Sequence, residues 1–157
     1  MLEIDCTDEA IIDADPATVL KAIADESMGK THWWLPCWEG KPRGDIPYDQ
    51  VSGMIDVTVH KGPTVRFTLK TVEVTENRLR VEVVGGDFRG EGIWTFEPVD
   101  GKTRARFRWH VRPTGLIGFM LRFAPPEERA GRSHREVMKA GFEGLNQHLR
   151  QLKAQAV

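Results

Sequence analysis

The sequence has little of what marks secreted, metal-bound or membrane-spanning proteins. Only two of its 157 residues are cysteines, Cys6 and Cys37, too few for a disulfide framework and without metal-ligand spacing. No apolar run approaches the ~20 residues that a membrane-spanning helix needs. The first residues, MLEIDCTDEA, lack the basic and then apolar pattern of a signal peptide. We therefore expect a cytoplasmic protein with free thiols and no integral membrane segment.

An excess of charge of one sign is also missing. The chain has 22 Lys and Arg against 23 Asp and Glu, which leaves a net charge of −1. This balance gives no overall field for attracting nucleic acid or an anionic membrane, so we expect no nucleic-acid partner. The five histidines are scattered without the HExxH spacing of a zinc site, and no GxSxG nucleophile motif occurs. The sequence therefore predicts no metal site.

Strand-like alternation is what the chain has in abundance. Residues 2–13 alternate loosely, and apolar side chains recur at every second position in 51–60, 64–74, 77–84, 88–98 and 102–111. The clearest case puts Phe107 and Trp109 on one face and Arg106 and Arg108 on the other. This predicts a meandering antiparallel sheet of about six strands with one apolar face. The polar stretch EGKPRGDIPYD between residues 39 and 49 is interpreted as a loop.

Helical signals flank this strand region. Asp15 as N-cap and Pro16 at the first helical position predict a helix that ends near residues 25–29, and a short second helix or turn can follow in 28–34. Pro36 prevents a helix from continuing beyond that point. Near the C-terminus, a capping-box pattern at Ser133 and Glu136 and an apolar stripe predict one long helix over about 133–153. Before it, TGLIGFMLRFA is expected to form a short apolar helix or lid.

This order of elements resembles the START/Bet v 1-like (SRPBCC) superfamily, and within it the polyketide cyclase/dehydrase and lipid transport-like proteins. The resemblance covers nearly the whole chain and rests on IDADPATVLKAIAD, WWLP, EPVDGKTRARFRWHV and GFEGLNQHLRQL. It implies one ligand-binding domain over residues 1–157 with an α+β helix-grip fold. In that fold a curved antiparallel β-sheet wraps around a long C-terminal α-helix, with two short helices after the first strand. It also implies an apolar cavity between sheet and helix and no cofactor.

Aromatic residues supply the candidate binding site. MGKTHWWLPCW, residues 28–38, holds three of the five tryptophans. Burying one tryptophan is worth about 4–6 kcal/mol gross, so a purely structural role would suffice for each. Trp94 and Trp109 fall on the apolar sheet face, which the resemblance makes the cavity face. We predict a ligand site formed by Trp34, Trp38, Phe67, Trp94, Phe107, Trp109, Met138 and Phe142, with Trp33 packed away from it. His32 and His134 are candidates for orienting a polar group or for acid–base catalysis, although capping or surface roles would explain both.

Three functions are compatible with these features. The first is binding of a hydrophobic small molecule, such as a lipid, quinone, polyketide-like or aromatic compound. The second is a polyketide cyclase or dehydratase that needs no cofactor and uses a pocket histidine as general acid/base. It requires His32 or His134 to face the cavity. The third is a protein-binding module that uses the apolar segment Leu116–Phe123 as its contact surface. The same segment offers a transient contact to a membrane or to a second copy of the chain.

Overall fold

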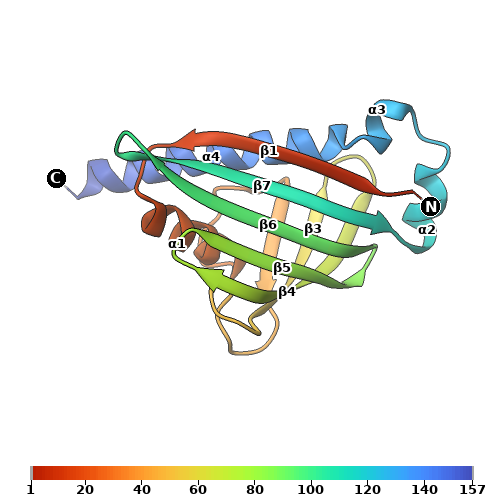
Figure 1. Ribbon diagram of the computed structural model, residues 1–157, viewed down its shortest axis with the longest axis horizontal. Coiled ribbons are helices and arrows are strands. Elements are labelled where there is room, and N and C mark those ends of the chain that lie inside the picture. Colours follow the sequence, from red (N-terminus) through yellow and green to blue (C-terminus); the bar gives the residue numbers. More distant parts are fainter. Residues whose placement is uncertain (1, 157) are drawn as a thin grey trace.

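The structure is a computed structural model that describes residues 2–156, and its centre is one antiparallel sheet of seven strands in the order β1-β7-β6-β5-β4-β3-β2 (Figure 1). The strands are β1 Ile4–Ile12, β2 Trp38–Pro42, β3 Met54–His60, β4 Thr64–Thr75, β5 Arg78–Gly86, β6 Phe88–Val99 and β7 Lys102–Pro113. The helices are α1 Pro16–Ser27, α2 Gly115–Leu121, α3 Pro126–Arg129 and α4 Arg132–Gln155.

The two faces of the sheet separate as the alternation predicts. Phe107, Trp109 and Val111 of β7 are buried on the inner face. On the outer face, the guanidinium groups of two arginines donate hydrogen bonds to carboxylates of the neighbouring strand β1: Arg106 to Glu9, and Arg108 to Asp5. The sheet therefore has one apolar and one charged side, and the apolar side needs a cover.

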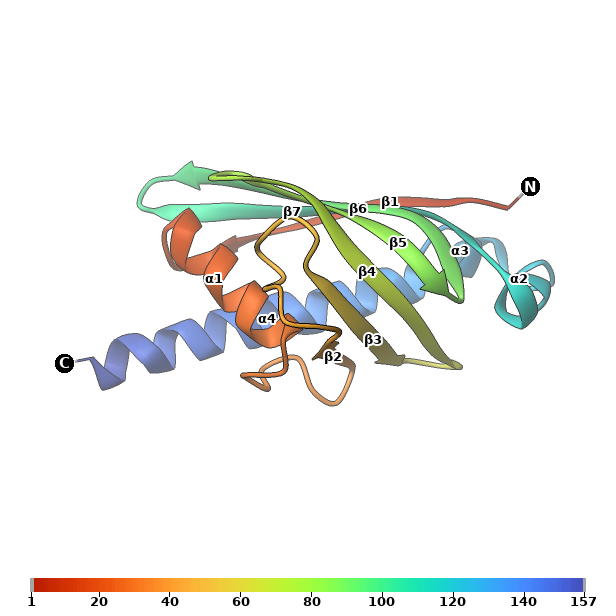
Figure 2. The same ribbon diagram turned by 90° about the horizontal axis from the view of Figure 1, so that it is seen from below.

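The long helix α4 supplies this cover and crosses the concave side of the curled sheet (Figure 2). Its inward stripe is fully buried and consists of Val137, Met138, Gly141, Phe142, Leu145 and Leu149. The fold class predicted from the sequence, a sheet gripping a long C-terminal helix, is confirmed. Among the described residues, no helix is both long and apolar enough to cross a membrane.

The N-terminal helix begins as the sequence indicates. Asp15 is the N-cap of α1 and accepts hydrogen bonds from the backbone N–H and the hydroxyl of Thr18, at 3.3 Å and 2.6 Å. Pro16 occupies the first helical position, where its missing N–H costs nothing.

Four local expectations are wrong. The second short helix after β1 is absent, because residues 28–37 form bends and turns around Pro36. Residues 39–42 of the expected loop belong instead to β2, which pairs with β3. The capping box is not made either: Gly131 is the N-cap of α4 without a side-chain hydrogen bond, and the Ser133 hydroxyl bonds Glu128 instead. The sheet accordingly has seven strands rather than six.

Candidate functional site: a two-part cavity beneath the sheet

A cavity of about 490 Å³ opens at the end of the molecule where α2, α3 and the start of α4 meet the sheet. Its apolar wall comes from five strands and two helices: Ile4, Val59, Val65, Phe67, Phe88, Trp109, Ile117, Met120, Leu121 and Val137. Its polar lining belongs to the β3–β4 hairpin and to α3 and α4, where Lys61 pairs with Glu136 at 3.2 Å and Arg132 pairs with Glu128 at 3.1 Å. We call this space the outer cavity.

A second space of only about 40 Å³ lies deeper in the core, and we call it the inner cavity. That volume holds water but no organic ligand. Phe67, Trp109, His134 and Val137 line both spaces and therefore form the partition between them. The ligand-sized room thus lies at the α2 end, and the densest aromatic packing lies beyond the partition.

The aromatic stretch of residues 28–38 forms the far wall of the inner cavity. Trp34 stacks on Trp38 with 4.5 Å between ring centroids, and its Nε1 donates to the carbonyl of Val137 on α4 at 2.9 Å. The buried carboxylate of Glu26 holds the backbone here, accepting from the N–H groups of Trp33 and Trp34 at 3.0 Å and 2.9 Å. This tract therefore fastens α1 and α4 to each other as well as lining the cavity.

The other predicted ligand residues are distributed unequally. Phe67 and Trp109 reach both cavities, whereas five others reach the inner cavity alone: Trp34, Trp38, Trp94, Phe107 and Met138. Phe142 lies behind this wall, with its ring edge-on to Trp94 at 6.1 Å between centroids. Trp33 lines a separate surface groove with His32 and His148, so His32 does not face the cavity.

His134, from the first turn of α4, stands in the partition. Its ring stacks on Trp109 with 5.6 Å between centroids and 6° between planes. Its Nδ1 lies 3.3 Å from a carboxylate oxygen of Asp8 and 3.4 Å from the sulfur of Cys6, both on β1. Because a carboxylate only accepts hydrogen bonds, this contact places the proton on Nδ1 and leaves Nε2 of the neutral ring as an acceptor. The arrangement fixes the imidazole at the cavity wall.

The thiol in this cluster is inert. Burial, with a smaller contribution from the negative charge of Asp8, raises the pKa of Cys6 to about 11. Within residues 2–156, Cys6, Asp8 and His134 are the one group of three potential metal ligands that converge, with ligand atoms within 4.8 Å of one another. Asp8 is already shared with Arg135, whose Nε lies 3.5 Å from its second oxygen. The cluster therefore fits a hydrogen-bond network around the imidazole better than a metal centre.

Sequence reasoning missed Asp8 and most of the outer cavity. The signal for Asp8 was its parity, because it shares the inward face of β1 with Ile4, Cys6 and Ile12. A charged residue on an apolar strand face needs a partner, and α4 provides it. Phe67 and Trp109 of the outer cavity were predicted, but its aliphatic wall has no comparable signal, because residues such as Val65, Ile117 and Leu121 are brought together only in the folded chain.

This architecture, a curled antiparallel sheet closed by a long helix over an apolar cavity, defines a protein of the Bet v 1/START helix-grip class. A family model described as polyketide cyclase / dehydrase and lipid transport matches residues 3–156, and the chain belongs to this family. Its description points to hydrophobic ligand binding or polyketide cyclase-like function. No curated protein matches the sequence.

Solved structures with the same fold are distant in sequence. The Zhui aromatase/cyclase from Streptomyces sp. R1128 has a TM-score of 0.72 and 10% identity, over 95% of this chain and 94% of that one. A START superfamily protein from Mycobacterium smegmatis has a TM-score of 0.71 and 15% identity, over 94% and 98% of the two chains. Ara h 8.0201 has a TM-score of 0.68 and 13% identity, over 95% and 99%. At these identities the likeness shows the fold alone.

Proposed function

We propose that the chain binds a hydrophobic small molecule, such as a lipid, quinone, polyketide-like or aromatic compound, in the outer cavity. The observation that carries this proposal is the cavity itself, about 490 Å³ of space with a largely apolar wall. Ligand sites for organic molecules span roughly 300–1,000 Å³ and have mostly apolar linings with a few polar groups. The inner cavity, at about 40 Å³, stays part of the core.

The wall suggests how such a ligand lies. Phe67, Phe88 and Trp109 form a cluster with ring centroids 5.2–5.9 Å apart, and this cluster presents aromatic surface to the cavity. A flat or extended apolar body gains contact with these rings as it leaves water. Its polar group then stays at the mouth, near Lys61 and Arg132, where charged side chains already meet solvent.

Native mass spectrometry of freshly purified protein, searched for a co-purified apolar compound, is the first test. A second test uses the fluorophore 1-anilinonaphthalene-8-sulfonate as the probe, which combines apolar aromatic rings with one sulfonate group. Val65→Trp places a large ring in the outer cavity and should weaken probe binding at least tenfold. Val84→Trp, on the outer face of β5, is the matched control and should leave binding unchanged. Equal probe affinity in both variants would refute the proposal.

A second candidate is catalysis of the polyketide cyclase/dehydratase type, and the Asp8–His134 contact favours it. A carboxylate that holds Nδ1–H orients the ring and leaves Nε2 free to take a proton. In such a reaction, Nε2 would remove a proton from the acidic carbon between two carbonyls of a poly-β-keto chain. The resulting enolate would attack another carbonyl to form the ring. The imidazolium would return its proton to the alkoxide formed in this attack, which gives a hydroxyl group. Nε2 would then remove the second proton of the attacking carbon and pass it to that hydroxyl, so that the carbon–oxygen bond breaks, water leaves and a carbon–carbon double bond forms.

This candidate is tested with a poly-β-keto thioester and chromatographic detection of the cyclised product. His134→Gln should lower the rate about a hundredfold, the range for loss of a general acid–base group, while affinity for the fluorescent probe persists. Asp8→Asn should lower the rate less and alter its pH profile, because Asp8 acts through His134. Cyclisation by His134→Gln at the wild-type rate would exclude this role.

A further inference from the structure

The short helix α2 and the turn that follows it present an unusual apolar surface to solvent. Leu116, Phe119, Met120 and Phe123 are 72%, 58%, 44% and 77% exposed, and the rings of Phe119 and Phe123 contact each other at 5.4 Å. We call these four residues the apolar tip. Scattered apolar side chains are normal on protein surfaces, but a contiguous group of large ones marks an interaction site.

The other side of α2 is part of the outer cavity. Ile117, Met120 and Leu121 line that space, so Met120 belongs both to the apolar tip and to the cavity wall. Whatever covers the tip therefore sits directly at the cavity mouth. This continuity connects the contact surface with the space in which an apolar ligand would reside.

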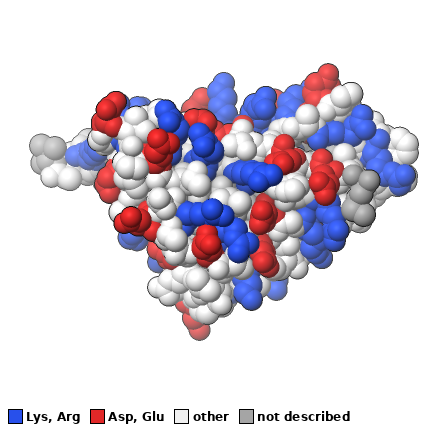
Figure 3. All heavy atoms as spheres, in the orientation of Figure 1, with Lys and Arg blue, Asp and Glu red and all other residues white. Residues whose placement is uncertain are grey.

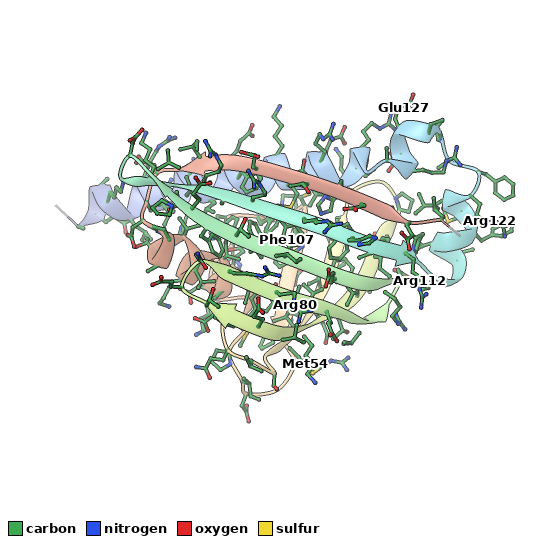
Figure 4. The ribbon with its side chains drawn as sticks, in the orientation of Figure 1. Met54, Arg80, Phe107, Arg112, Arg122 and Glu127 are labelled. Atoms are coloured by element: carbon green, nitrogen blue, oxygen red, sulfur yellow. The ribbon has the colours of Figure 1, made fainter. Side chains whose placement is uncertain are left out.

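Two arginines near the tip differ from those in the middle of β7 in having no acidic partner within residues 2–156. Along the middle of β7, Arg104, Arg106 and Arg108 each pair with a carboxylate. At the α2 end, Arg112 and Arg122 have no ion pair among the described residues (Figure 4). Figure 3 shows Lys and Arg gathered at the same end of the molecule. The net charge of −1 therefore conceals a local basic surface.

The pairing of two strands adds to this basic character. Arg89 on β6 lies directly opposite Arg112 on β7, so both side chains leave the same face of the sheet. Like charges in such a cross-strand pair repel each other. Within the described chain neither has a carboxylate partner, and Arg89 bonds only the carbonyls of Gly86 and Phe88. An anionic surface beside this pair would relieve the repulsion.

We propose that the apolar tip docks into the surface of an anionic lipid bilayer, with Arg89, Arg112 and Arg122 against the lipid phosphates. Apolar side chains leave water when they enter the boundary between headgroups and acyl chains, and arginine binds phosphate oxygens with two parallel hydrogen bonds. The negative potential of such a membrane adds attraction for each basic residue. The dockable surface thus combines both contributions at one end of the fold.

A second copy of the chain fits this surface less well. In a two-fold symmetric dimer the same patch meets itself, so the unpaired arginines of both copies would face each other. The bilayer supplies the opposite charge instead. Docking would also turn the cavity mouth toward the lipid, so that an apolar ligand enters without crossing water. This last consequence rests on the proposed function, whereas docking itself does not.

Sedimentation with extruded vesicles tests the proposal on the full chain. The protein should bind vesicles of phosphatidylcholine with 30% phosphatidylglycerol, bind pure phosphatidylcholine more weakly, and dissociate as salt rises. Phe119→Ser with Phe123→Ser should lower the binding constant by about tenfold or more. Arg112→Gln with Arg122→Gln should reduce the preference for the anionic vesicles and its salt dependence. None of these four residues lines the outer cavity.

Matched controls lie at the opposite end of the molecule. Leu152→Ser removes an apolar residue that is 47% exposed on α4, and Lys102→Gln removes a charge in the β6–β7 hairpin; both should bind vesicles like the wild type. Failure of the wild type to bind anionic vesicles, or equal losses in the controls, would overturn the proposal. A third result would also overturn it: the wild type is a dimer in light scattering, and the two phenylalanine substitutions make it a monomer without weakening vesicle binding. Probe binding without vesicles reports separately on the cavity.

Discussion

Gly141 on α4 lets the helix approach the tryptophan tract, and replacing it by alanine tests how tightly that contact is packed. A Cβ at this position would lie 2.4 Å from Cε2 and 2.6 Å from Cζ2 of Trp34. The indole cannot move easily, because it stacks on Trp38 and donates a hydrogen bond to Val137. Overpacking costs ~1–3 kcal/mol and a lost hydrogen bond about 0.5–1.5 kcal/mol. The higher helix propensity of alanine offsets ~1 kcal/mol of this cost.

We therefore expect Gly141→Ala to lower the free energy of unfolding by about 1–3 kcal/mol, or the Tm by roughly 3–9 °C. Urea unfolding followed by circular dichroism measures the first quantity. The matched control is Ala140→Gly, an exposed position on the same helix, which should lose about 1 kcal/mol through helix propensity alone. A Gly141→Ala variant as stable as the wild type, or more stable, would show that α4 and Trp34 are not tightly packed.

Three further changes probe other contacts. Glu26→Ala leaves the three donors around its carboxylate unpaired and should cost about 3 kcal/mol or more in urea unfolding, with Glu26→Gln losing less. Asp15→Ala should cost ~1 kcal/mol near neutral pH. Hydrogen bonds from Thr18 lower the pKa of Asp15, so this stabilisation is present above the ordinary pKa of aspartate and disappears as acid protonates the folded state; unfolding curves of both proteins should converge at low pH. At pH 8, a thiol reagent should modify Cys37 in the folded protein and Cys6 only after unfolding. Burial raises the pKa of both thiols, to about 11 for Cys6, but Cys37 is partly exposed whereas Cys6 is buried.

The strands were predictable because side-chain parity reports which face is buried. The alternation of Phe107 and Trp109 with Arg106 and Arg108 has the same meaning in the sequence and in the structure. β2 was not predicted because it is short, contains Gly40 and ends at Pro42. Its strand conformation depends on pairing with β3. Local propensity cannot show a strand that its neighbour imposes.

The candidate site was predictable only in part, for the same physical reason. Aromatic side chains on the inner face, such as Trp94, can be assigned to the core from the sequence. The contact of Asp8 with His134 joins residues 126 positions apart and requires the final placement of α4. The capping box predicted at Ser133 and Glu136 is another case. Because α3 places Glu128 beside the Ser133 hydroxyl, this hydroxyl bonds Glu128 instead of capping α4.

The order of the sheet has a consequence for how the protein associates with other molecules. An open sheet ends in two strands with unpaired backbone groups, which invite strand addition and aggregation. Here β2 is five residues long and carries Lys41 and Pro42, while β1 is fastened to α4 where Asn146 donates to the carbonyl of Ile11 at 3.0 Å. Both edges are poor templates for another chain. Association with other molecules is therefore left to side-chain surfaces. The protein can expose the apolar tip without offering a sheet edge on which fibres could grow.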